Sequence, residues 1–520
     1  MQNRPVVAQY TIRSKQQYIY ATNRMREIEG ASRAISGAFA LLLQCARDLY
    51  GTGKVVSASP KDPHPLGRCF SNEAAQTALR EGTLKVIELF CGGGNDMLLF
   101  AGEEVFLEVN RAFSYALQQK YPGMIPLAVC CDQQDYLRLT RKMSDEKSKM
   151  QPGRPLDTLP FALMDRTAWQ PLAVKVPNNG ERLSLESNAK RNARQEDAYK
   201  KAENAQGRAE GKYLDDLNTQ HGVESLLAVV HADGNRMGVK IKNRLANATD
   251  YSTCVNQMRA FTRKTNDVFA VCGVQAMWDA LDQLRQEHDL RASAFDFRPL
   301  IADGDDVTFV CNARLARGLT EAYLSAVQGY AEAHPDDTKE TYSSCAGICI
   351  FHSHYPFARA YELAEQACDS AKRKAHSADE EQAWIDLHYI HSGVGGDLDD
   401  LRAPHGTGAR MARPWRADAP TLHSLHTLDR LFALLKDNKV TRSNIKSVGN
   451  AYEVSTTDGV NELYRVYYRV PGLKEKLYRL FRPYVETDAE VEPAIMCTFY
   501  DLSEVYDLWY AQRTNEKEEG

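Results

Sequence analysis

The chain has 520 residues, 43% hydrophobic and 26% charged, which is typical of a globular protein with about two to four domains. Its net charge of -5 excludes an overall electrostatic attraction to nucleic acid but does not exclude a local basic groove. No segment approaches the roughly 18 apolar residues of a membrane span, and the N-terminal residues lack the apolar core of a signal peptide. The sequence therefore predicts a cytoplasmic protein with no membrane partner.

The first unit, residues 1–149, has the pattern of a mixed domain of strands and helices. Strands are predicted on either side of a glycine-rich turn, Cys91-Gly-Gly-Gly-Asn95, where glycine permits φ > 0 and a close approach of a ligand. The predicted elements in chain order are a strand at 6–12, a helix at 19–50, strands at 84–90 and 97–100, a helix at 103–120, a strand at 125–131 and a helix at 132–149.

Residues 150–222 read as a linker or insert between two larger units. They begin with turns rich in proline and glycine and continue with a charged, alanine-containing stretch from Asn188 to Gly211. Such a composition is typical of a solvated helix or a linker rather than a core.

The second unit, residues 223–395, repeats the order of the first. Its predicted elements are a strand from Ser225, a helix at 253–288, a hairpin around Gly304, a helix at 313–334, a strand at 344–351 and a helix at 356–374. Two βααββαβα units in one chain indicate an internal duplication. Aligning the two hairpins places Gly94-Asn95 on Asp305-Asp306, and the first strand of the first unit has no aspartate. We therefore expect metal ligands in the second unit alone.

Three aspartates of the second unit lie at predicted strand ends. Asp233 follows a buried strand, and Asp305 and Asp306 lie at the tip of the hairpin between two apolar runs. Aspartates also favour turns because they accept hydrogen bonds from backbone amides, so the hairpin alone would not decide between the two interpretations. The combination favours a site for Mg²⁺, which prefers one or two carboxylates together with substrate phosphates. This ligand set is typical of a nucleotidyl-transfer palm.

A helix with a small-residue apolar face is predicted to bring a lysine to the same place. It begins near Pro356 and continues through Ala360, Ala364 and Ala371 to Lys372. Small residues permit close packing on a sheet, which would direct Lys372 across the sheet toward the hairpin. The alternative is a solvated lysine with no role in the site. After about Gly396, residues 396–520 begin with a connector rich in Gly, Pro and Arg and then show the apolar periodicity of a small helical domain.

These residues resemble a known family. The second unit resembles the catalytic palm of the large subunit of type III CRISPR effector complexes, the cyclic oligoadenylate synthetases that are related to GGDEF diguanylate cyclases. The matching segments are Ala232-Asp-Gly-Asn-Arg-Met-Gly238, Asp303-Gly-Asp-Asp306, His352-Ser-His-Tyr-Pro356, and Ala364-Glu-Gln-Ala367 to Ala371-Lys372. The first unit resembles the other palm of that family through residues 18–32 and 92–95, and the tail resembles its closing helical domain through Arg413-Pro-Trp and Asp501-Leu-Ser-Glu504.

The resemblance implies an α+β fold with two ferredoxin-like palms, the first non-catalytic, and a C-terminal helical domain. It implies two Mg²⁺ or Mn²⁺ ions about 4 Å apart at Asp233, Asp305 and Asp306, the catalytic residues. The nucleotides would lie where the palms face each other, in contact with Gly234, Asn235, Gly238, Gly304, Lys372, Gly93, Gly94 and Asn95. The implied product is a cyclic oligonucleotide second messenger, made from ATP or other nucleoside triphosphates in antiviral defence. The implied partners are subunits of a CRISPR RNA complex, or target RNA as activator. A homo-oligomer is not excluded.

The chain departs from the family pattern in three respects. We expect no N-terminal phosphohydrolase domain, because the first palm begins at residue 5, and therefore no DNase activity. The zinc-ribbon cysteines between the palms are missing. Its hairpin reads DGDD where the family has GGDD, which places Asp303 where glycine would let a triphosphate approach. Two other functions stay open: a ribonucleoprotein scaffold that binds nucleotide or RNA without turnover, and a nucleotide cyclase unrelated to CRISPR. The three aspartates argue against the scaffold, because a non-catalytic palm would be free to lose them.

Overall fold

The computed structural model describes residues 4–132, 136–149, 163–164, 170–176, 180–195, 214–217, 225–246, 248–288, 290, 297–335, 340–377, 381–391, 395–402 and 411–510. The chain forms two compact units. The first comprises Met1–Leu214, Arg236–Ala270 and Leu300–Asp305, and the second comprises Asp215–Asn235, Val271–Pro299 and Asp306–Gly520. Among the described residues, no helix combines the length and the apolar character that crossing a membrane requires.

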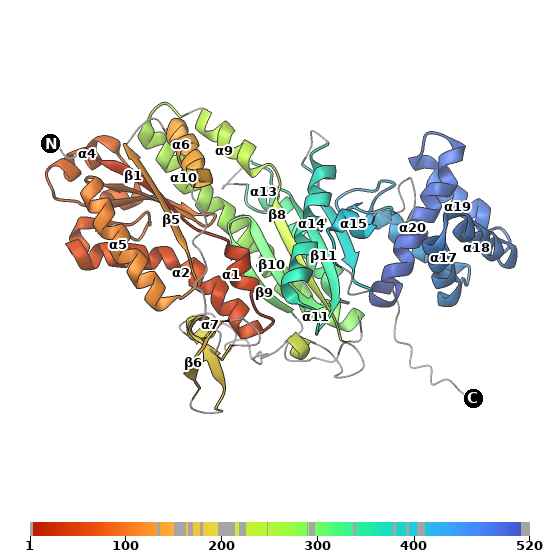
Figure 1. The fold of residues 1–520 in the computed structure, drawn as a ribbon. Coiled ribbons are helices and arrows are strands. Elements are labelled where there is room, and N and C mark those ends of the chain that lie inside the picture. Colours follow the sequence, from red (N-terminus) through yellow and green to blue (C-terminus); the bar gives the residue numbers. More distant parts are fainter. Residues whose placement is uncertain are drawn as a thin grey trace. The chain divides into compact units, whose positions relative to one another are not determined.

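A five-stranded sheet forms the centre of the first unit (Figure 1). Its strand order is β2 (Val55–Val56), β3 (Val86–Gly92), β4 (Asn95–Phe100), β1 (Val6–Ile12) and β5 (Pro126–Asp132). Tyr10 on β1 packs against Phe106 and Phe113 of helix α5 (Glu103–Lys120), so α5 covers one face of this sheet. The remaining helices of this region are α1 (Lys15–Tyr20), α2 (Met25–Tyr50), α3 (Pro65–Arg68), α4 (Asn72–Arg80) and α6 (Tyr136–Lys149).

The predicted linker contributes a helix that packs on this domain. Helix α7 (Leu185–Gln195) follows the small hairpin of β6 (Leu172–Lys175) and β7 (Arg182–Ser184) and lies against α2. A Cβ atom on Gly30 of α2 would lie 1.7 Å from the carbonyl oxygen of Lys190, so glycine is required for this approach. Lys190 itself is buried and pairs with Glu186 in the same helix. The expectation of a solvated helix was therefore wrong for α7, while residues 196–213 lie outside the described residues.

Helix α10 (Tyr251–Thr265), which follows α9 (Met237–Ala246), packs on the opposite face of the first sheet. Gly92 leaves room for it, because a Cβ atom there would lie 2.0 Å from Cγ2 of Thr262. Arg259 is 3% exposed, and burial lowers the pKa of its guanidinium to about 10. Its nitrogens donate hydrogen bonds of 2.6 to 3.0 Å to the backbone carbonyls of Leu66, Gly67, Glu88 and Leu89.

A six-stranded sheet forms the centre of the second unit. Its strand order is β13 (Trp415–Arg416), β12 (Trp384–Tyr389), β11 (Ser344–His352), β8 (Leu226–Gly234), β10 (Asp306–Asn312) and β9 (Phe297–Asp303). The order β9-β10-β8-β11 repeats the order β3-β4-β1-β5 of the first sheet. The predicted duplication and the α+β fold with two palm sheets are therefore confirmed.

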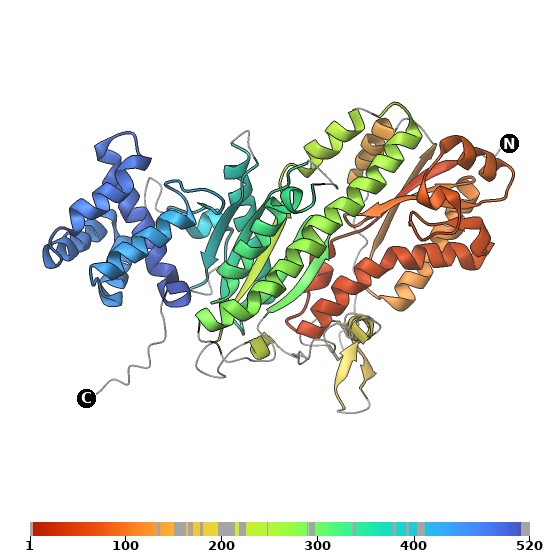
Figure 2. The same ribbon diagram turned by 180° about the vertical axis from the view of Figure 1, so that it is seen from behind.

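Helices cover both faces of the second sheet. Trp278 of α11 (Val274–Glu287) packs on Phe297, which packs on Phe309. Tyr361 of α14 (Phe357–Ala375) packs on His231 of β8. The residue before His231 on this strand, Val230, is the cross-strand partner of Phe309. Because successive strand residues point to opposite faces, α11 and α14 lie on opposite sides of the sheet. Figure 1 shows α14 over one face, and Figure 2 shows the green helix α11 over the other. Further helices here are α12 (Ala316–Gln328), α13 (Tyr330–Ala333) and α15 (Leu398–Arg402).

The chain ends in a helical domain that is joined to the second sheet by buried ionic contacts. Its helices are α16 (Leu425–Asp437), α17 (Arg442–Val454), α18 (Thr456–Arg469), α19 (Leu473–Phe481) and α20 (Val491–Val505). Asp501 of α20 accepts hydrogen bonds from the backbone nitrogen of Arg413 at 2.8 Å and from Nε1 of Trp415 at 3.0 Å. Arg413 is 1% exposed and also pairs with Glu504. The predicted C-terminal helical domain is thus confirmed.

The Asp501 carboxyl group should make stability fall as the pH rises. Burial raises its pKa to about 7, with Glu504 adding to the rise and Arg413 opposing it. The unfolded value is about 3.9, so the folded state binds the proton more tightly, and this stabilisation is lost as the pH rises from about 4 through 7. Burial raises the pKa of Glu504, but Arg413 and His391 lower it more, to about 2. The effect of Glu504 on stability therefore changes with pH only below this window.

We expect Asp501→Asn, which has no proton to lose, to gain stability relative to the unchanged protein between pH 5 and pH 8. Thermal unfolding of both proteins at the two pH values measures this, with exposed Asp400→Asn as control. An unfolding-temperature difference that is the same at both pH values would contradict the prediction.

Candidate functional site

Two of the three predicted catalytic aspartates lie side by side at the ends of neighbouring strands. Asp233 on β8 is the direct cross-strand partner of Asp306 on β10. Directly opposite residues in an antiparallel pair have Cβ atoms roughly 4.5–5.5 Å apart, so both carboxylates can reach one ligand. Their side chains are 33% and 36% exposed, which leaves both open to solvent. Asp305 precedes Asp306 in the turn and is the last residue of its segment of the first compact unit. That it binds metal stays a prediction.

Lys372 of α14 reaches Asp233 across the sheet. Gly347 on β11 makes this possible, because a Cβ atom there would lie 2.0 Å from the carbonyl oxygen of Ala364 and 2.2 Å from the nitrogen of Cys368. With the helix seated this closely, Nζ of Lys372 donates a hydrogen bond to Oδ2 of Asp233. A positive group thus already binds one carboxylate of the pair, which indicates that these oxygens suit a cation. Oxygen ligands of this kind fit Mg²⁺ or Mn²⁺.

His231 is a site residue that the sequence analysis quoted but did not assign. It lies two residues before Asp233 on β8, so both side chains point to the face that α14 covers. Its Nδ1 atom is 3.2 Å from Oγ1 of Thr308 and 3.5 Å from Oδ1 of Asp306. Burial lowers the pKa of His231 while Asp233 and Glu365 oppose the change, so the imidazole is neutral at pH 7. A neutral, buried imidazole beside Asp306 can orient that carboxylate. The alternating pattern His231-Ala-Asp233 was the signal that could have found it.

The other predicted nucleotide contacts of the second palm have mixed surroundings. Asn235 is buried, and its Nδ2 atom donates hydrogen bonds of 2.8 Å to Oγ of Ser343 and to the carbonyl oxygen of Gln382. Its amide nitrogen is therefore used to hold the end of β8. Gly234 is the last residue of β8. Gly238, the second residue of α9, has open space where a Cβ atom would lie. Contact of these residues with nucleotide stays a prediction.

The glycine turn of the first palm is rigidly held. Gly93 and Gly94 have φ values of 58° and 67°, the left-handed conformations that a two-residue hairpin turn of this kind requires. Nδ2 of Asn95 donates a hydrogen bond to the carbonyl oxygen of Gly93 at 3.0 Å, and Oγ1 of Thr11 donates one to that of Gly94 at 3.1 Å. Asn95 thus stabilises the turn, which is preorganised before any ligand binds.

The turn of the second palm approaches this glycine turn inside the first compact unit. A Cβ atom on Gly304 would lie 3.8 Å from Cα and N of Gly93. Burial raises the pKa of the neighbouring Asp303, and Lys15 of the first palm opposes the change. The Lys15 side chain also covers Gly94, where a Cβ atom would lie 1.4 Å from Nζ. Asp303, the first acidic residue of DGDD, therefore lies near a positive charge, that of Lys15 in the first palm.

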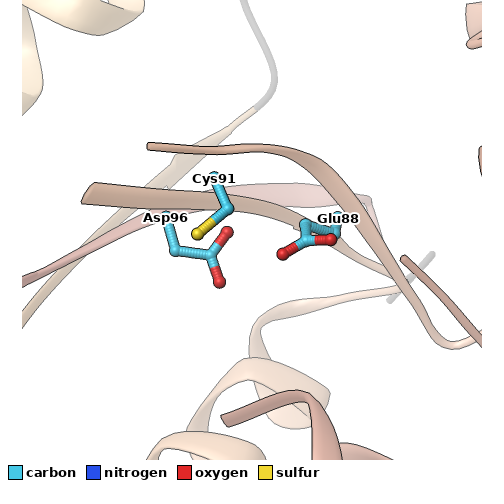
Figure 3. Close-up of side chains that lie close together, drawn as sticks. All are labelled: Glu88, Cys91 and Asp96. Carbon is cyan, nitrogen blue, oxygen red and sulfur yellow. The ribbon is translucent and has the colours of Figure 1, made fainter. Parts of the chain in front are cut away.

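The first palm carries a cluster of ligand-type side chains under its turn. Glu88, Cys91 and Asp96 each offer one ligand atom within 4.8 Å of the others (Figure 3). Burial raises the pKa of Asp96, and Glu88 adds to the rise. That metal ligands lie in the second unit alone stays a prediction.

The second palm and the fold have counterparts among known proteins. Residues 226–380 match the family described as Cas10/Cmr2, second palm domain. A chain of the Csm1–Csm4 cassette in complex with cA4 has the same fold, with a TM-score of 0.53 and 11% identity over 97% of this chain and 69% of that chain. The cassette in complex with AMPPNP gives a TM-score of 0.55 and 11% identity over 97% and 69%. The cassette in complex with cA3 gives 0.53 and 11% over 98% and 70%. No curated protein matches the sequence.

Proposed function

Because residues 226–380 are a Cas10/Cmr2 second palm domain, we propose that the chain joins nucleoside triphosphates into a cyclic oligonucleotide with release of pyrophosphate. The observation that carries the proposal is the pairing of Asp233 with Asp306 at the strand ends of this domain, with Lys372 against Asp233. The matched Csm1–Csm4 structures contain cA4, cA3 and AMPPNP, which favours ATP as the substrate. The product would act as a second messenger in CRISPR-type antiviral defence, with CRISPR complex subunits or target RNA controlling its synthesis.

The reaction forms a bond between a 3′-hydroxyl oxygen and the α-phosphorus of the next triphosphate, and it breaks the bond from that phosphorus to pyrophosphate. Bound Mg²⁺ or Mn²⁺ would favour the deprotonated hydroxyl and neutralise the departing pyrophosphate. Asp233 and Asp306, together with Asp305, provide the carboxylate oxygens for it. His231 lies beside Asp306, and Lys372, which pairs with Asp233, would bind phosphate after leaving that carboxylate. The catalytic contribution of the chain is positioning and charge neutralisation.

The direct test is incubation of the purified full chain with each nucleoside triphosphate and Mg²⁺ or Mn²⁺, followed by mass spectrometry. Candidate activators, including RNA and cell extract, are added in parallel reactions. We expect phosphodiester-linked products from ATP, alone or with another triphosphate, together with pyrophosphate. If ATP binds but no nucleotide, metal or activator gives a linked product, the chain is a nucleotide-binding scaffold.

Gly93→Val should separate nucleotide binding from product formation. Gly93 has φ of 58°, which valine adopts only with strain, and its Cβ position faces open space next to Gly304. If the second nucleotide lies against this turn, the variant should still bind ATP but lose about tenfold or more of its product yield, since a misplaced reactant loses the benefit of proximity. Product analysis and equilibrium ATP binding measure the two effects. Gly53→Ala, in open space away from both turns, is the control. Normal product yield from a folded Gly93→Val protein would exclude a pocket shared by the palms.

A further inference from the structure

The first palm contains a cluster of one thiol and two carboxyl groups that the proposed reaction does not use. Cys91 and Asp96 are cross-strand partners at the base of the glycine turn, and Glu88 lies three residues before Cys91. In a regular strand, residues three apart point to opposite faces. Here a register shift between Glu88 and Phe90 turns Glu88 to the side of Asp96 and Cys91. Figure 3 shows the three side chains pointing to the same side of the hairpin.

The burial of Asp96 indicates that a binding partner is missing. Asp96 is 0% exposed, and among the described residues no donor meets its carboxylate oxygens in good hydrogen-bond geometry. The carboxyl group that interacts with it is that of Glu88, another acid, which adds to burial in raising the pKa of Asp96. The hydroxyl of Tyr10, its cross-strand neighbour on β1, is also buried without a partner. Buried polar atoms are nearly always hydrogen-bonded, and each exception costs about 1–3 kcal/mol. A bound cation would satisfy several of these atoms at once.

Glu88 has partners of its own that fix it in the cluster. Oε2 of Glu88 accepts a hydrogen bond from the backbone nitrogen of Ala58 at 2.5 Å. Its backbone carbonyl accepts one from Nη2 of Arg259 at 2.6 Å. These contacts leave Oε1 for a ligand on the side of Asp96. A proton shared between Glu88 and Asp96 is the alternative, and it differs from a metal site in that it involves neither the sulfur of Cys91 nor bound zinc.

We propose that Glu88, Cys91 and Asp96 bind a zinc ion in the first palm. Sulfur and carboxylate oxygen are ligands that Zn²⁺ accepts, at about 2.0–2.3 Å, and three protein ligands leave a fourth position for water. Ligand atoms that lie within 4.8 Å of one another need shifts of only about an ångström to reach such a geometry. Cys91 is an exposed residue, whereas Glu88 and Asp96 are buried, so the cluster lies at the edge of the first palm.

The ion would join both strands of the hairpin directly below the glycine turn. Cys91 precedes Gly92 and Asp96 follows Asn95, so the two ligands enclose the turn on both sides. Zinc bound there would fix the turn that approaches Gly304, and it would stabilise the first palm without taking part in the chemistry. The proposal is therefore independent of whether the second palm is catalytic.

Zinc content and a cobalt spectrum of the full chain test the proposal. After zinc loading and gel filtration, the unchanged protein should retain one zinc ion per chain, measured by elemental mass spectrometry. Cobalt substituted for zinc should give a near-ultraviolet band from thiolate ligation. Cys91→Ser should abolish that band, and both Cys91→Ser and Asp96→Asn should weaken zinc binding by about tenfold or more.

Two control variants should retain the metal. Cys69→Ser removes an exposed cysteine outside the cluster, and Asp305→Ala/Asp306→Ala removes the predicted ligands of the second palm. If Asp96→Asn does not fold, Cys91→Ser decides the test alone, because its residue is exposed. The proposal is overturned if the unchanged protein retains no zinc, or if Cys91→Ser retains zinc and the cobalt band as the unchanged protein does.

Discussion

Replacing Asp305 and Asp306 together by alanine should abolish product formation while leaving the second palm folded. Asp306 is the cross-strand partner of Asp233, and both side chains are about one third exposed, so neither fills a core. Without these carboxylates, neither the attacking hydroxyl nor the departing pyrophosphate is stabilised. The expected loss in rate is about 10³-fold or more, equivalent to several kcal/mol of transition-state stabilisation.

The measurement compares product yield, ATP binding and thermal unfolding of the double variant with those of the unchanged protein. In the protein without bound metal, removing two adjacent negative charges relieves their mutual repulsion. The unfolding temperature should therefore stay the same or rise. Asp399→Ala/Asp400→Ala is the matched control, because it removes an adjacent pair of exposed carboxylates on α15 instead. Unchanged product formation in the Asp305→Ala/Asp306→Ala protein would place the active site elsewhere.

Gly347→Ala should destabilise the second unit by about 3 kcal/mol or more, the largest stability effect we expect from a single methyl group. The added Cβ atom would lie 2.0 Å from the carbonyl oxygen of Ala364 and 2.2 Å from the nitrogen of Cys368. Both contacts are with the backbone of α14, so no side-chain rotation relieves them. The helix would have to move away from the sheet, which would also withdraw Lys372 from Asp233.

Chemical and thermal unfolding measure this effect, and Gly238→Ala provides the control. Gly238 lies in α9 with no atom within 4 Å of its Cβ position, so alanine there should be neutral or stabilising by up to about 1 kcal/mol. Equal unfolding midpoints for Gly347→Ala and the unchanged protein would contradict the packing that brings Lys372 to the site.

The elements best predicted from the sequence are those with strong local patterns. Helix α5 was predicted at residues 103–120 and spans Glu103–Lys120, because its apolar positions repeat with helical spacing. The small-residue face of α14 correctly indicated close packing on the sheet, and the structure adds Gly347 as the complementary residue on β11. The two hairpins align as expected, with Gly93-Gly94 and Gly304-Asp305 at corresponding turn positions.

The errors arise where contacts distant in sequence decide the structure. The cluster in the first palm was missed because Glu88 and Cys91 would fall on opposite faces of a regular strand, and the register shift in β3 brings them together. Helix α7 looked solvated because of its charges, but one of them, Lys190, is buried against α2 and neutralised by Glu186. Its composition carries no signal for that packing. The predicted roles of Asp305 and the nucleotide contacts stay predictions.

Arg259 limits how the chain can be divided for expression. A fragment of residues 223–395 would carry helix α10 without Leu66, Gly67, Glu88 and Leu89, whose carbonyl groups accept the hydrogen bonds of this guanidinium. The face of α10 that includes Thr262, which approaches Gly92 in the full chain, would then be exposed to water. We therefore expect residues 223–395 alone to fold less stably than the same residues within the full chain, because the carbonyl groups that hold Arg259 would be missing.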